Sequence, residues 1–262
     1  MGTGAIDFQS IEGNSIRFAG GDTGSRTFKN LIFRNAQRAL PPGSDGEITN
    51  YRGGFIDLID SGVTVTITGC TFNNCYVPRS LGTAIILKSG SKNHVIENSL
   101  ITGCTGGASG IMCVGPSTVS ISGCTFTNNK NSDTGTLWVE QVSCHAVVTN
   151  CKFNDKNISV FVYSGTVSLT GCTVYTCRIR NGTLVLSGVN KCDCIMRHNT
   201  ESETIVSIAA GATINLQGSS QNNAITGSIT AEGDFTLIDV SGTSHTIPAG
   251  SYSTIHRDGT YE

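Results

Sequence analysis

Nearly the same nine residues occur three times in this chain, at unequal intervals. The copies are ITGCTFNNC from Ile67 to Cys75, ISGCTFTNN from Ile121 to Asn129 and LTGCTVYTC from Leu169 to Cys177. Weaker copies extend the series when the chain is aligned on the Cys of the Gly-Cys pair, at Leu31, Cys70, Ser99, Cys124, Cys151, Cys172 and Val189. Self-similarity at intervals of about 20 to 30 residues is typical of a solenoid, in which each repeat packs on the next.

Each repeat has the same internal pattern. An apolar strand such as GTAIIL, SGIMCV or GTLWVE precedes an alternating strand such as VTVTITG, TVSISG or TVSLTG, and an Asn-rich corner follows. Alternation with period two predicts β-strands, and no segment has a helical period. We therefore predict an all-β chain that folds as a right-handed, single-stranded parallel β-helix. It would have about nine coils of three short strands each, stacked about 4.8 Å apart.

Equivalent residues of neighbouring coils are expected to stack into columns. We expect an inward Cys column at Cys70, Cys124, Cys151 and Cys172. A Phe column follows at Phe33, Phe72, Phe126 and Phe153. Corner residues are expected at Asn35, Asn74, Asn128 and Asp155, because Asn tolerates left-handed backbone. The Cys residues are expected to be reduced core side chains, since stacked Cβ vectors seldom give the dihedral angle of a disulfide.

The pattern predicts one domain over residues 1–262. Regular coils are expected from about residue 15 to about residue 200, and less regular coils with a cap from about residue 201 to residue 262. An open coil presents unpaired strand edges. We therefore expect a flanking domain, a subunit or the non-repetitive tail to cover the ends.

Composition excludes several classes of partner. The net charge is −2 and 14% of residues are charged, so a broad basic field for nucleic acid is not expected. No apolar run of membrane-spanning length occurs, so direct membrane insertion is not expected. The Cys spacings match no zinc pattern, and we expect neither a metal nor a cofactor. The N-terminus lacks the features of a signal peptide. Either the protein stays in the cytosol or the chain belongs to a longer precursor, for which we expect an extracellular or cell-surface location.

Two short motifs resemble a known family. Phe126-Thr127-Asn128-Asn129 has the form Phe-x-x-Asn, and GGFI at residues 53–56 and GTAI at residues 82–85 approximate Gly-Gly-Ala-Ile. From about Thr27 to Val189 the chain resembles the repeats of polymorphic outer membrane proteins, which are surface passenger domains. The resemblance implies a β-helix and an adhesive role.

The apolar strands supply the candidate site. If Leu58, Leu87, Cys113, Val139 and Val162 point inward, their neighbours form an outward stripe around the single Trp of the chain, in which Trp138 and Phe161 are expected side by side on adjacent coils. The candidate ligand-binding residues are Lys88, Met112, Trp138, Glu140, Phe161, Tyr163, Arg178 and Arg180. An exposed aromatic stripe with a polar rim suits a glycan or a protein partner. The alternative is that the loops at residues 36–51 or 76–80 fold over the stripe and bury it.

Three functions are compatible with this fold. Polysaccharide lyases and glycoside hydrolases need clustered carboxylates, but the closest pair here, Asp57 and Asp60, has mixed orientation in one strand. Ice binding needs a flat Thr array, which Val95 and Glu97 interrupt. We therefore expect a non-enzymatic structural or adhesive module of a surface protein that binds a glycan or a protein along the stripe. A polysaccharide-active enzyme of pectate-lyase or glycoside-hydrolase type is the alternative, and ice binding is a minor one.

Overall fold

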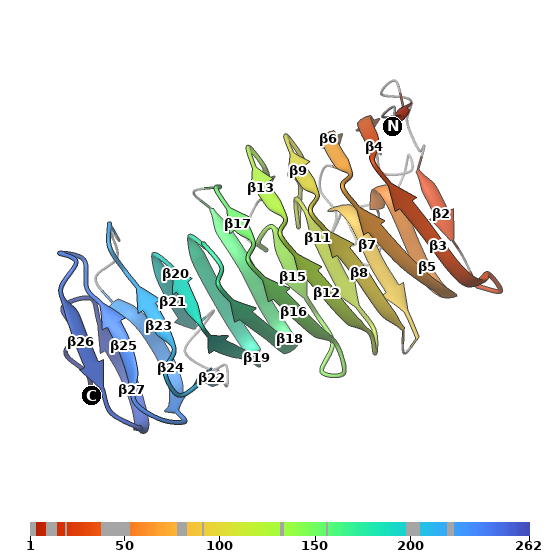
Figure 1. The fold of residues 1–262 in the computed structure, drawn as a ribbon. Helices are drawn as coiled ribbons and strands as arrows, with labels where there is room; N and C mark the ends of the chain where they lie inside the picture. Colours follow the sequence, from red (N-terminus) through yellow and green to blue (C-terminus); the bar gives the residue numbers. More distant parts are fainter. Residues whose placement is uncertain are drawn as a thin grey trace, which may run out of the picture.

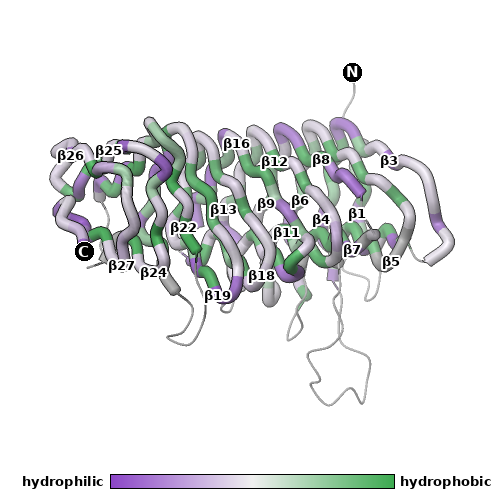
Figure 2. The backbone as a smooth tube through the Cα atoms, turned by 90° about the horizontal axis from the view of Figure 1, so that it is seen from below, coloured by the Kyte–Doolittle hydropathy of each residue, from purple (hydrophilic) through white to green (hydrophobic). Residues whose placement is uncertain are grey.

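The structure is a computed structural model and describes residues 4–8, 15–18, 20–37, 53–77, 83–90, 92–131, 134–155, 157–197, 205–218 and 223–262. These residues form β-strands, turns and bridges and no helix. The all-β prediction is confirmed. In Figure 1 the strands follow one another along a single axis, and the two chain termini lie at opposite ends. Figure 2 shows the same coils from below.

Almost all neighbouring strands pair in parallel, and they belong to three sheets. The 8-stranded sheet contains β1 (Gly4–Asp7), β4 (Leu31–Gln37), β6 (Thr71–Tyr76), β9 (Leu100–Thr102), β10 (Thr105–Gly106), β13 (Thr125–Thr127), β14 (Lys130–Asn131) and β17 (Lys152–Phe153). The 15-stranded sheet contains β2 (Ile16–Phe18), β3 (Thr23–Lys29), β5 (Gly53–Thr68), β7 (Thr83–Ser89), β8 (Asn93–Glu97), β11 (Ile111–Val114), β12 (Thr118–Ser122), β15 (Leu137–Val139), β16 (His145–Thr149), β18 (Ile158–Thr170), β19 (Thr176–Ser187), β21 (Cys194–Arg197), β22 (Ile205–Ile208), β24 (Asn223–Ala231) and β27 (Gly250–His256). The 4-stranded sheet contains β20 (Val189–Lys191), β23 (Thr213–Asn215), β25 (Phe235–Ile238) and β26 (Ser244–Ile247).

The Cys column lies in the core as expected, and all eleven Cys residues are buried and free. The backbone N–H of Cys124 donates to Sγ of Cys151 on the next coil, 3.4 Å away, and Sγ of Cys151 donates to the carbonyl of Thr149 at 3.4 Å. The predicted register is wrong at the last repeat. Asn190, not Val189, lies opposite Cys172, because the N–H of Cys172 donates to Oδ1 of Asn190 at 3.0 Å and Val189 is exposed.

The Phe column is confirmed but divided. Phe33 stacks on Phe72 with ring centroids 4.6 Å apart, and Phe126 stacks on Phe153 at 4.4 Å. Ile101 lies between the two pairs, opposite both Phe72 and Phe126. Two offset-stacked pairs of rings therefore fill this side of the core.

Asn side chains hold one corner of the coils in left-handed backbone. Asn35, Asn74 and Asn128 have φ of 59°, 61° and 58°, and Nδ2 of Asn74 donates to Oδ1 of Asn35 at 2.9 Å. Asp155 does not belong to this corner column, because its Oδ1 accepts the N–H of Asn129 at 3.0 Å. The prediction for Asp155 is therefore wrong by one residue.

A second corner alternates Asn with Gly from coil to coil. The column consists of Asn30, Gly69, Asn98, Gly123, Asn150 and Gly171, all with positive φ. Each Asn amide leans over the glycine of the following coil. A Cβ at Gly123 would lie 2.5 Å from Oδ1 of Asn98, and one at Gly171 would lie 2.4 Å from Oδ1 of Asn150. Both residue types tolerate left-handed backbone, but only Gly leaves room for the Asn below it.

The alternation predicts that Gly171→Ala destabilises the chain more than Gly211→Ala does. Gly171 and Gly211 have similar φ, 65° and 71°, but a Cβ at Gly211 would meet nothing within 4 Å. Both variants carry the backbone cost of about 1–2 kcal/mol, and only Gly171→Ala also displaces an amide. Urea unfolding should separate the two, and adding Asn150→Gly should recover part of the loss. Equal unfolding free energies for the two single variants would contradict the packing account.

A buried histidine occupies a core position of β8. His94 is 1% exposed, and its Nδ1 accepts the backbone N–H of Val65 at 3.2 Å. Burial lowers the pKa of His94 to about 4. The imidazole is therefore neutral in the folded chain at neutral pH, whereas in the unfolded chain it takes up a proton below about pH 6.5.

This burial makes stability depend on pH. The burial of neutral His94 costs no stability above about pH 6.5. As the pH falls from there toward 4, the free energy of unfolding decreases, because the unfolded state binds the proton first. Between pH 7 and pH 5 the free energy of unfolding should fall by about 2 kcal/mol in urea titrations. His94→Leu should flatten this slope. An unchanged slope in that variant would mean that other groups cause the pH dependence.

At the C-terminal end the chain reverses direction. β27 pairs antiparallel with β24, and β26 pairs antiparallel with β25. The N-terminal coil has no such reversal among the described residues, since β1 pairs with β4, and β2 and β3 pair with β5. That a flanking domain or subunit covers an end stays a prediction.

Candidate functional site

The structure confirms the register of the aromatic stripe. Met112 lies opposite Trp138, and Trp138 lies opposite Phe161, on neighbouring strands of the 15-stranded sheet. The ring centroids of Trp138 and Phe161 are 5.8 Å apart at an interplanar angle of 45°. Phe161 in turn lies opposite Arg178. The prediction that the two rings are side by side on adjacent coils is therefore correct.

The expected exposure of the stripe is wrong. Trp138 is 4% exposed, Phe161 2% and Met112 0%. These side chains form a cluster separate from the main core, together with Ile86, Ala108, Val114 and Ile158. Most of the loops at residues 36–51 and 76–80, which were expected as a possible cover, lies outside the described residues. Outward apolar side chains have been removed from water here, as the hydrophobic effect favours.

Only the rim of the stripe reaches solvent. Tyr163, Glu140, Arg178, Arg180 and Lys88 are half-buried. Cζ of Arg180 lies 4.6 Å from the centroid of the Tyr163 ring, a cation–π contact. The rim is therefore a small cationic and aromatic patch over buried rings.

Because Trp138 is buried, Trp138→Ala should lower the free energy of unfolding by about 3–5 kcal/mol. Val142→Ala, at a residue that is 83% exposed, should leave stability unchanged within about 0.5 kcal/mol. Urea unfolding followed by circular dichroism measures both. A Trp138→Ala variant as stable as the wild type would show that the indole is not packed.

A polar groove that sequence reasoning missed lies where the sheet next to the Asn corners is interrupted. Between β17 and β20 only single bridges through Thr173 join the coils. An open pocket of about 240 Å³ lies there. It is lined by Phe153, Asn154, Asp155, Thr173, Val174, Tyr175, Lys191, Cys192, Asp193, Gln217 and Gly218. A second pocket of about 310 Å³ shares Asn154 and Asp155 with the first and adds Asn128, Asn129, Lys130 and Asn157. We call the two together the polar groove.

Asp155 at the centre of the groove is held by its neighbour. Its Oδ1 accepts the backbone N–H of Asn129 and its Oδ2 accepts Nδ2 of Asn129, both at 3.0 Å. Oδ1 of Asn129 accepts the N–H of Cys104 on the preceding coil. Burial raises the pKa of Asp155, and the hydrogen bonds from Asn129 oppose that rise. Both carboxylate oxygens therefore accept hydrogen bonds that hold neighbouring coils together.

Tyr175 is the aromatic member of the groove. Its ring is half-buried, its N–H donates to Oγ of Ser159 at 2.8 Å, and its carbonyl accepts the N–H of Asp193 at 2.9 Å. Lys191 is exposed beside it. An aromatic face among amides and an ammonium group is a combination that orients sugar rings and their hydroxyls. The signal in the sequence was a polar or aromatic residue three positions after each of Cys151, Cys172 and Asn190, at Asn154, Tyr175 and Asp193.

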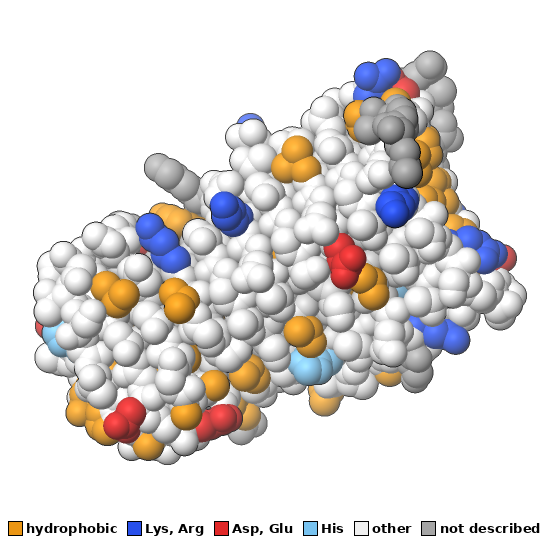
Figure 3. Space-filling model, in the orientation of Figure 1, with side chains coloured by type: hydrophobic (Ala, Val, Ile, Leu, Met, Phe, Trp, Pro, Cys, Tyr) orange, Lys and Arg blue, Asp and Glu red, His pale blue; other side chains and the backbone are white. Residues whose placement is uncertain are grey.

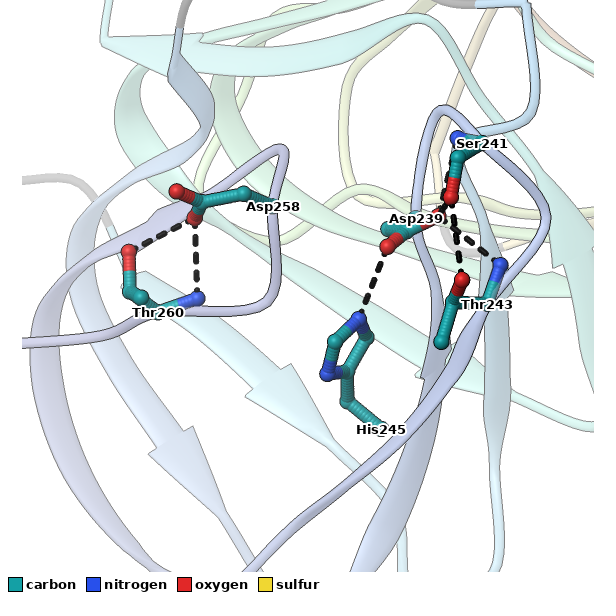
Figure 4. A network of polar contacts seen from close by, with 6 residues as sticks. All are labelled: Asp239, Ser241, Thr243, His245, Asp258 and Thr260. Carbon is teal, nitrogen blue, oxygen red and sulfur yellow. Dashed lines mark hydrogen bonds and ion pairs between the residues drawn. The ribbon is translucent and has the colours of Figure 1, made fainter.

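One arrangement that suggests catalysis has a structural explanation. Asp239, Ser241 and His245 have the composition of a hydrolase triad (Figure 4). The carboxylate of Asp239, however, accepts hydrogen bonds from both other residues, from Oγ of Ser241 at 2.7 Å and from Nε2 of His245 at 2.9 Å. In a catalytic triad the imidazole lies between the other two residues. Here the carboxylate closes the turn between β25 and β26, and the hydrogen bond from His245 lowers the pKa of Asp239.

Of the closest carboxylate pair in the sequence, the structure describes the side chain of Asp57 alone. Asp57 is fully buried, and its Oδ2 lies 4.0 Å from Nε of Arg17. The side chain of Asp60 lies outside the described residues. Within the described ranges no group of three or more His, Cys, Asp or Glu side chains could hold a metal ion. None of the described segments is a helix long and apolar enough to cross a bilayer.

Comparisons with known proteins identify a family and no individual relative. The model of the right-handed β-helix region matches residues 6–251. No curated protein matches the chain. No solved structure matches it. The resemblance to polymorphic outer membrane protein repeats is not supported by any relative.

Proposed function

The chain belongs to the right-handed β-helix family, and from that premise we propose that it is a non-enzymatic binding module of a surface protein that holds a glycan in the polar groove. The family includes enzymes and non-enzymes, so the fold alone decides neither. The observation that carries the proposal is the groove itself, in which successive coils present Asn, Lys and Tyr side chains to solvent.

The shape of the groove supports a chain-like ligand. Its lining comes from residues 128–130, 153–155 and 157, 173–175, 191–193 and 217–218, which follow one another coil by coil. Five stacked coils extend about 19 Å along the axis. On the face in view in Figure 3, Lys and Arg side chains are scattered among uncharged polar atoms. Such a surface favours hydrogen bonding to hydroxyl groups over capture of a highly charged polymer.

The state of the carboxylates supports binding over catalysis. A glycoside hydrolase needs one carboxyl group as acid and a second as base or nucleophile, both facing the scissile bond. Asp155 and Asp193 line one pocket, but both carboxylate oxygens of Asp155 accept hydrogen bonds from Asn129. An acid so engaged cannot deliver a proton to a leaving group without breaking the corner of its coil. Polysaccharide cleavage is therefore the weaker alternative.

The rim of the aromatic stripe is a second candidate contact, with a protein as partner. Its support is the half-buried Tyr163 under Arg180, with Glu140, Arg178 and Lys88 beside it. The buried side chains beneath the rim would support this contact by packing against it: Met112, Trp138 and Phe161. Hot spots of protein interfaces are enriched in Tyr and Arg with such support.

A glycan panel tests the primary proposal. We expect at least one oligosaccharide to bind, and Tyr175→Ala to weaken that binding at least tenfold, about 1.4 kcal/mol, because the ring supplies the apolar face. Tyr261→Ala, at an exposed Tyr outside the groove, is the control. Binding measured by calorimetry should be unchanged in that variant.

Three outcomes would contradict the proposal. New reducing ends or unsaturated products would show an enzyme. Loss of glycan binding in Tyr163→Ala with full binding in Tyr175→Ala would place the ligand on the rim. Failure of every glycan to bind would remove the groove as a glycan site.

A further inference from the structure

The two ends of the β-helix are finished differently. At the C-terminal end the last residues close the outer edge of β27: the carbonyl of Glu262 accepts the N–H groups of Ser253 and Thr254, and the carbonyl of Thr260 accepts the N–H of His256. Gly259 lies against the ring of His245, where a Cβ would come within 2.5 Å of the imidazole. These three N–H groups of β27 are therefore not free to pair with another strand.

Among the described residues, the N-terminal coil has a strand edge without a partner. Within the described part of the chain, β3 pairs only with β5, and six of its seven residues are exposed. Partly buried apolar side chains of this coil, Ile16, Phe18 and Phe28, pack against the end of the core. A strand edge of this length above an apolar core is a template for pairing with another chain.

Arg26 lies in the core-facing row of that edge strand. Its position is opposite Val65, and Phe28 two residues later is opposite Ile67, both buried core residues. Thr27 between them is opposite Thr66, which faces outward. A chain that continued the pattern would place an apolar residue at position 26. The guanidinium instead lies over the ring of Phe18, with Cζ 5.7 Å from the centroid, and Nη1 donates to the carbonyl of Ser25.

We infer that Arg26 prevents a second copy of this chain from stacking on the first coil. A strand added beside β3 would cover the guanidinium and take it out of water without a carboxylate to pair with it. Burial of an unpaired charge outweighs the gain from a few edge hydrogen bonds. In a two-fold arrangement of two such edges, a second Arg26 side chain would lie in the same interface.

The test is the oligomeric state of variants at position 26, measured by sedimentation velocity over about two decades of protein concentration. The wild type and Arg26→Lys, which keeps the charge, should remain monomeric. Arg26→Val should associate at least tenfold more tightly than the wild type.

A folded Arg26→Val that stays monomeric would overturn the inference, as would a wild type that dimerises with the same affinity as Arg26→Val. If Arg26→Val does not fold, Arg26→Gln keeps the polar stem without the charge. That variant should associate more tightly than Arg26→Lys, and equal behaviour of the two would contradict the role of the charge.

Discussion

In-register stacking of parallel strands determines where nearly every other residue of this chain lies. Each residue has the equivalent residue of the next coil as its neighbour, so a side chain that packs well once can be repeated. The Cys column joins thiols to backbone groups of the coil beside them. The alternation of Asn and Gly at one corner is the same constraint in a less obvious form, because each amide needs a residue without Cβ above it. Loops between coils can vary in length as long as the strands return to register.

The sequence was sufficient for the parts of the fold that repeat. It predicted the strand order, the inward columns and the contact of Trp138 with Phe161, since all of these follow from period-two alternation on stacked coils. It was wrong by one residue at Asn190 and at Asp155, where a corner gains or loses a residue. It also missed the Asn–Gly column, because two different residue types, Asn and Gly, adopt the same left-handed backbone conformation there.

The candidate site was harder to predict because it depends on what does not repeat. Alternation shows that Trp138 points away from the core, but it does not show whether another segment covers the ring. The polar groove arises at a break in the sheet between β17 and β20, where Thr173 alone bridges the coils. A solenoid offers flat, repeated surfaces almost everywhere, so an interruption of the repeat is the place where a hollow with mixed side chains can form. For this reason we place the proposed glycan site at the break.

The location of the bound glycan is the central claim, and hydrogen exchange followed by mass spectrometry tests it most directly. The chain would be compared with and without the tightest-binding oligosaccharide of a panel. The account predicts slower exchange in peptides that contain residues 154–157, 173–175 and 191–193, with no change over β11 and β15. Protection confined to β11, β15 and the first half of β18 would contradict it, because the ligand would then lie over the aromatic stripe.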